Sequence, residues 1–181
     1  MMKANELRDK TTAELEAQLT SLKKDLFFLR MQHATNQLDN PLKIQSVKKE
    51  LAAQGVEYSF AKLCEEASAE RIESLVDCND ARFLAPQSMI AEVKAYCSEH
   101  GQEVPETPAQ IAAVIYNSLA FCYGETVREL EEITGASYRQ IHIVGGGANA
   151  DYLNRLTARY TGRTVYAGPT EATAIGNLSA Q

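Results

Sequence analysis

The sequence predicts a chain of the α+β or α/β class in two parts, a helical hairpin followed by a larger, helix-rich unit with about two parallel strands. Three observations predict this division. Leucines recur at helical spacing near the N-terminus, a strand, a glycine turn and a helix follow one another late in the chain, and the formal charge changes sign between the parts. We expect the two domains to span residues 1–54 and 55–181.

The formal charge differs between the two parts of the chain. Residues 1–50 carry nine Lys/Arg and seven Asp/Glu, a formal charge of +2, whereas residues 51–181 carry nine and seventeen, a charge of −8. Hydrophobic residues make up 45% of the sequence, which is enough for a packed core. The first part is therefore the one suited to a polyanionic partner, and the second part would repel it.

Several classes of function find no support in the sequence. No apolar run approaches the length of a membrane span, and the first ten residues are polar, so we expect a cytoplasmic protein that contacts neither membrane nor DNA. The four cysteines include no closely spaced pair, and the three histidines lie far apart. We therefore expect no metal site, no catalytic histidine, and thiols that are reduced and mostly buried.

The first part is predicted to be an antiparallel hairpin of two helices. Thr11 and Glu14 have the spacing of a capping box, and leucines then recur at intervals of four and three residues, at Leu15, Leu19, Leu22, Leu26 and Leu29. Asn40-Pro41 would open a second helix. That helix would bury Leu42 or Ile44, then Val47 and Leu51.

Literal strings in this region resemble a known family. They are Met2–Arg8, Thr12–Leu15, Phe28–Gln32 and Asn40-Pro41, and together they resemble the large-subunit ribosomal proteins of the L-twenty-nine family over nearly all of residues 1–50. The resemblance implies that this part contacts large-subunit rRNA and neighbouring ribosomal proteins. Side chains at matching positions that would neutralise phosphates are Lys3, Arg8, Lys10, Arg30, Lys43, Lys48 and Lys49. After Glu50 the sequence departs from the family, which continues with further basic residues.

The second part alternates helical and strand patterns. Helices are predicted over residues 59–67 and 87–99, and a long one runs from the N-cap Thr107 to Gly135. Two short apolar runs, Ile141–Val144 and Thr164–Tyr166, read as strands, with a helix between them that ends at Gly162. A last helix would begin at Glu171.

The triple glycine Gly145–Gly147 between the first strand and its helix is the clearest candidate site. Without Cβ atoms the backbone can come close to a ligand, and the free N–H groups of a helix start favour anionic groups. The same glycines also suit a tight connection that binds nothing. The spacing matches neither the dinucleotide fingerprint nor the Walker loop.

Longer strings decide between these interpretations. Ile141–Asn149, Leu153–Leu156, Thr161–Val165 and Ala167–Asn177 resemble the carboxy-terminal domain of the FGGY carbohydrate kinases, most closely their rhamnulokinase branch. The resemblance implies the ATP-side lobe of an actin-like, ribonuclease-H-type fold. It also implies that ATP or adenosine would be bound weakly, by Gly145, Gly146, Gly147, Ala148 and Asn149.

The chemistry of a kinase is not expected to be complete. In the family the phosphate-binding hairpins, the Mg²⁺ site, the catalytic aspartate and the sugar pocket all precede the segment present here. No aspartate matches that motif, and Asp77, Asp80 and Asp151 read as loop or helix-start residues. We therefore predict no catalytic residue and no Mg²⁺ site.

Three hypotheses of function follow. The chain is an rRNA-binding protein with a non-catalytic kinase fragment attached, a rhamnulokinase-type enzyme, or an artefactual chimera whose parts have no joint function. Because two strands leave most of a sheet uncovered, we also expect association through exposed sheet edges.

Overall fold

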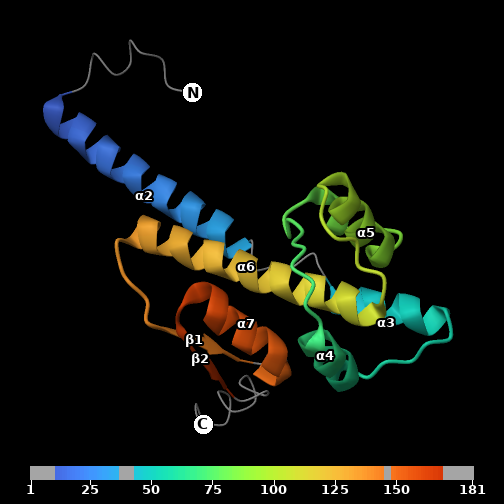
Figure 1. Ribbon diagram of the computed structural model, residues 1–181. Helices are drawn as coiled ribbons and strands as arrows, with labels where there is room; N and C mark the ends of the chain where they lie inside the picture. Colours follow the sequence, from blue (N-terminus) through green and yellow to red (C-terminus); the bar gives the residue numbers. More distant parts are fainter. Residues whose placement is uncertain (1–10, 37–42, 145–147, 169–181) are drawn as a thin grey trace, which may run out of the picture.

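A computed structural model of the chain describes residues 11–36, 43–144 and 148–168 (Figure 1). Helices dominate it, and the two strands are parallel, so the predicted helix-rich α+β chain is confirmed. In chain order the elements are α2 (Thr12–Asn36), α3 (Ile44–Ala53), α4 (Phe60–Ala69), the 3₁₀ turn η1 (Ala81–Phe83), α5 (Met89–Glu99), α6 (Pro108–Thr134), β1 (Gln140–Ile143), α7 (Asp151–Thr161) and β2 (Thr164–Ala167).

Helix α6 is the axis of the fold. Thr107 caps its first turn reciprocally with Gln110, Pro108 occupies the first turn, and Gly135 ends it in the left-handed conformation at φ 66°, all as predicted. From Ile111 to Tyr116 every side chain is buried, because α3, α4, α5 and α7 surround this part of the helix (Figure 1). The core is thus built around one long helix.

The strands lie at one side of this axis. Strand β1 pairs in parallel with β2, in a register that sets Ile141 opposite Val165, and α7 connects them while it packs on α6. Side chains on both strands are half-buried or exposed, and His142 stacks on Tyr166 with ring centroids 5.1 Å apart. Both strands match their predicted positions to within a residue or two. The predicted last helix lies outside the described residues.

The predicted hairpin between the first two helices is wrong. Helix α2 lies along the C-terminal half of α6 and does not pack on α3 to any extent (Figure 1). Val47 and Leu51 of α3 are buried as expected, but they face α5 and α6. The leucine stripe of α2 stays open to solvent, from 38% exposed at Leu15 to 63% at Leu29. The apolar face of α3 packs against α5 and α6, which offer a larger apolar surface than α2 does.

An ion pair fastens the end of α6 to the strands. The guanidinium of Arg163, at the turn before β2, donates to both carboxylate oxygens of Glu131 at 2.9 and 3.1 Å, and the backbone N–H of Tyr138 donates to the same carboxylate at 2.8 Å. The Tyr138 hydrogen bond, and then Arg163, hold the pKa of Glu131 below its ordinary value. The charged form of Glu131 is therefore part of the folded state.

Replacing Glu131 by glutamine should change how stability depends on pH. A carboxylate whose folded pKa is depressed contributes stability above its unfolded pKa, about 4.3 for glutamate, and loses it as the pH falls through the folded value. Glu131→Gln should therefore have a lower urea midpoint than the parent at pH 7, and the difference should shrink below about pH 4. Glu132→Gln, at the exposed neighbouring position, is the control. If the urea midpoints of the parent and Glu131→Gln depended on pH in the same way, the ion pair between Glu131 and Arg163 would not stabilise the fold.

Candidate nucleotide site

Asn154 on α7 is a buried polar residue that contacts the segment following Gly145–Gly147. Gly145–Gly147 lie outside the described residues, whereas Ala148 is buried and Asn149 is exposed. The side-chain amide of Asn154 on α7 donates to the carbonyl of Ala148 at 3.0 Å. Asn154 is only 8% exposed, yet its Oδ1 has no hydrogen-bond partner among the described residues. Because this oxygen is itself buried, Asn154 belongs to the packing of α7 against the segment before it.

A groove of about 990 Å³ opens between α3, α4, α6 and α7, and Asn149 and Ala150 are among its lining residues. Asn149 lies at its edge, the one predicted nucleotide residue that the structure places there. Apolar and aromatic side chains form most of its wall, and two cations, Lys43 and Arg155, and two carboxylates, Glu65 and Asp151, stand among them. The main apolar lining residues are Ile44, Phe60, Tyr116, Leu119 and Tyr152. Its size and its apolar lining fit a flat ring, and its charged side chains balance one another.

Two tyrosines give the groove a rigid wall. The rings of Tyr116 on α6 and Tyr152 on α7 meet edge to face with centroids 5.6 Å apart, and the side-chain amide of Asn117 donates to the hydroxyl of Tyr152 at 3.4 Å. Burial raises the pKa of both phenols. They therefore remain neutral at physiological pH, and one aromatic wall is set before any ligand arrives.

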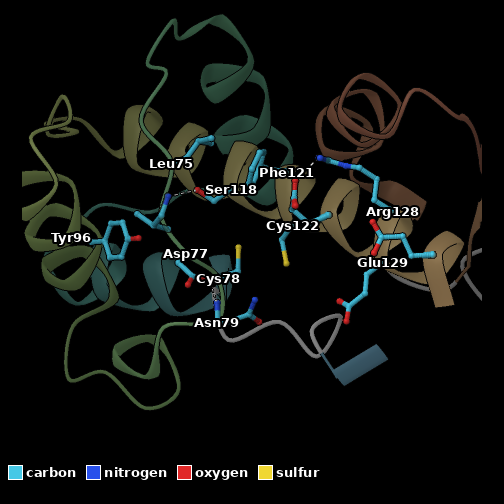
Figure 2. Close-up of a pocket in the computed structure, with 13 residues that line it drawn as sticks. Leu75, Asp77, Cys78, Asn79, Tyr96, Ser118, Phe121, Cys122, Arg128 and Glu129 are labelled. Carbon is cyan, nitrogen blue, oxygen red and sulfur yellow. Dashed lines mark hydrogen bonds and ion pairs between the residues drawn. The ribbon is translucent and has the colours of Figure 1, made fainter. Parts of the chain in front are cut away.

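A second pocket, of about 550 Å³, lies on the far side of α6 (Figure 2). Figure 2 shows Cys78, from the segment before η1, and Cys122 of α6 among its lining residues, with Arg128 and Glu129 at one end. The Cys78 thiol donates to Cys122, which raises the pKa of Cys78 and lowers that of Cys122. No disulfide joins any of the four cysteines, and three of them are buried, as expected.

The predicted rRNA-binding side chains do not form one described surface. Lys3, Arg8 and Lys10 lie outside the described residues, and Arg30 belongs to α2. The other three are on or beside α3, where Lys43 lines the groove and the ammonium of Lys48 lies 3.8 Å from the centre of the Phe60 ring. Two of the three described lysines thus face the second part of the chain.

Sequence reasoning missed the aromatic wall of the groove. Phe60, Tyr116 and Tyr152 come from three helices and share no local motif, and only the close approach of α4, α6 and α7 brings them together. The sequence offered one weak signal, Tyr152, which lies in the first turn of the helix that follows the glycines. Within the described ranges, no three His, Cys, Asp or Glu side chains gather as a metal site, and no helix is long and apolar enough to span a membrane.

Comparisons with known proteins identify two classes. The family model described as ribosomal L29 protein matches residues 5–53, and most of the chain is similar to carbohydrate kinases. The relatives among these kinases are rhamnulokinases. Those of Bacillus subtilis, Enterococcus faecalis and Klebsiella pneumoniae are 48%, 45% and 38% identical to 76%, 71% and 80% of this chain. The chain spans 28%, 26% and 30% of their lengths, respectively. The predicted two-part resemblance is confirmed.

The two similarities overlap at α3. Since 80% of the chain aligns with the Klebsiella relative, at most the first fifth of the chain precedes that alignment, and α3 begins later. The ribosomal family model also extends through α3, to residue 53. In the structure α3 packs with the second part. The predicted boundary at 54/55 stays a prediction, and the packing favours one before α3.

Glu50 shows how α3 is joined to the second part. One carboxylate oxygen accepts a hydrogen bond from the backbone N–H of Met89 at 2.6 Å, and the other accepts from the hydroxyl of Ser88 at 2.7 Å. Ser88 and Met89 form the start of α5, where free N–H groups and the helix dipole favour a negative charge. Glu50 of α3 thus caps a helix that lies 39 residues later in the chain.

Removing this cap should weaken the second part of the chain. We expect Glu50→Ala to lower the free energy of unfolding by about 1–2 kcal/mol, because the start of α5 loses its anionic acceptor. The measurement is urea unfolding followed by tyrosine fluorescence, since all eight tyrosines lie in the second part. Glu57→Ala, at an exposed position, is the matched control. Equal midpoints for the two variants would show that α3 is not fastened to α5.

Proposed function

We propose that this chain joins an rRNA-binding segment to a nucleotide-binding but non-catalytic fragment of a rhamnulokinase-like kinase. The observation that carries the second half is the groove between α3, α4, α6 and α7, with Asn149 in its lining. Similarity to rhamnulokinases supports ATP or adenosine as its occupant. It also supports our assignment of this part to the ATP-side lobe of an actin-like, ribonuclease-H-type fold, cut short at two strands.

The groove offers a distinct contact for each part of a nucleotide. The base would lie against Tyr152 and Phe60, where stacking on an aromatic face stabilises any flat heterocycle. Its polar edge would face Asn149 and the turn Gly145–Gly147. Lys43 and Arg155 would contact the phosphates, whereas Glu65 and Asp151 in the same lining would repel them. Because the groove is open, we expect weak affinity.

Phosphoryl transfer is not expected of this chain alone. Transfer needs a carboxylate that can take the proton of the sugar hydroxyl and a metal held at the phosphates. Asp77 accepts from the backbone N–H of Asn79 at 2.9 Å, and Asp80 accepts from the backbone and guanidinium of Arg82 at 2.9 and 3.2 Å. Both are used within turns. As the alternative, phosphorylation of L-rhamnulose, the activity of a complete rhamnulokinase, would require the parts of such an enzyme beyond the 26–30% of its length that this chain spans.

A binding measurement tests the groove. We expect a fluorescent ATP analogue to bind with a Kd near the millimolar range, and Tyr152→Ala to weaken it at least about fivefold, because one stacking face is worth about 1–3 kcal/mol. Tyr166→Ala on β2, away from the groove, should leave the Kd unchanged. Equal effects of the two substitutions would place the nucleotide elsewhere. A coupled assay with L-rhamnulose should show no turnover, and turnover above background would overturn the non-catalytic assignment.

A sedimentation experiment tests the rRNA-binding half. We expect part of the chain to pellet with large ribosomal subunits at low salt and to be released at high salt, because lysine contacts to phosphates release counterions. The double variant Lys48→Gln/Lys49→Gln should pellet less, whereas Lys23→Gln/Lys24→Gln, with the same charge change on α2, should behave like the parent. A chain that stays in the supernatant at both salt concentrations would favour the third hypothesis, a chimera whose parts have no joint function.

A further inference from the structure

The longest uncovered apolar surface in the described structure is the leucine stripe of α2. Leu19, Leu22, Leu26 and Leu29 are each more than half exposed, although together they make one continuous face. Covering a leucine completely is worth about 1.5–3 kcal/mol, so a stripe of this length is costly to leave in water. Helix α2 touches the rest of the molecule mainly along α6, and that contact leaves these four leucines more than half exposed.

The spacing of the stripe identifies the kind of surface that fits it. Intervals of four and three residues keep Leu15, Leu22 and Leu29 at d positions of a heptad, with Leu19 and Leu26 at a positions. A repeat of 3.5 residues follows a second helix wound around the first, whereas a helix lying on a globular core shows a broader face. The natural partner within the chain, α3, has its own apolar face buried at Val47 and Leu51.

We propose that α2 forms a parallel, in-register, two-stranded coiled coil with α2 of a second copy of this chain. In this arrangement each of the five leucines meets its own counterpart. The heptad also places Asp25 at a g position and Arg30 at the e position that faces it across the interface, so the pair attracts twice in the dimer. No like charges meet at the e and g positions between residues 12 and 36.

Antiparallel pairing satisfies the same sequence less well. One antiparallel register sets Leu29 against Thr12 and so leaves a leucine without an apolar partner. The other brings Lys23 beside Lys23 and Asp25 beside Asp25 of the second copy, which is unfavourable on both sides of the seam. The parallel arrangement avoids both costs.

Sedimentation equilibrium on the full chain tests the proposal. The expected mass at tens of micromolar is twice the 19.9 kDa of one chain, falling toward one chain on dilution. Leu22→Lys should weaken dimerisation at least about tenfold, while it leaves the monomer folded, since lysine and leucine have nearly equal helix propensity and Leu22 is 55% exposed. Phe28→Lys is the matched control, because Phe28 is 69% exposed but lies at a c position off the seam.

Two outcomes overturn the proposal. One is a chain that stays monomeric at about 100 μM, and the other is an equal loss of dimer in Leu22→Lys and Phe28→Lys, which would indicate general apolar association or pairing of sheet edges. Charge reversal tests the orientation. Asp25→Arg should weaken the dimer, and Asp25→Arg combined with Arg30→Asp should restore it. Failure of the double variant to recover overturns the parallel arrangement, because these positions face one another only there.

Discussion

The burial of one helix, α6, organises the described structure. Its middle turns carry no polar side chain except Asn117 and Ser118, and both are used: the Asn117 amide donates to the carbonyl of Ala113 at 2.9 Å, and the Ser118 hydroxyl accepts from the backbone N–H of Val76 at 2.9 Å. Such a helix has to be surrounded to be stable in water. Helices α3, α4, α5 and α7 therefore gather on it, and the two strands follow through α7.

The need to cover the apolar surface of α6 explains why α3 packs with the second part of the chain. Helix α6 presents more apolar surface than a single stripe of leucines, and α3 adds Val47 and Leu51 to a core that already holds Leu63, Phe83 and Met89. Glu50 then fixes the position of α3 through the start of α5. The ribosomal family model and the kinase alignment both cover α3, an amphipathic helix whose apolar face is buried in the core.

Helix caps, helix ends and strand positions could be predicted from the sequence, whereas the packing partner of each helix could not. The capping box of α6, its terminal Gly135, and the strand, turn and helix around Gly145–Gly147 depend on residues within a few positions of one another. The hairpin failed because the stripe of α2 and the face of α3 were each predicted correctly as apolar, yet nothing local states which apolar surface each will meet. Asn149 was expected at the site because of the resemblance to the FGGY kinases. Tyr116 and Tyr152 required knowledge of how α6 and α7 approach.

Because α2 is long and exposed, the chain should behave as an elongated molecule in solution. Its 25 residues span nearly 40 Å at about 1.5 Å per residue, and its N-terminal half extends beyond the compact part (Figure 1). A body with such an arm diffuses more slowly than a sphere of the same mass. Gel filtration calibrated with globular standards will therefore overstate the mass of a single chain, and an early elution volume carries no information on copy number. Light scattering or equilibrium sedimentation, which do not depend on shape, are the appropriate measures of mass.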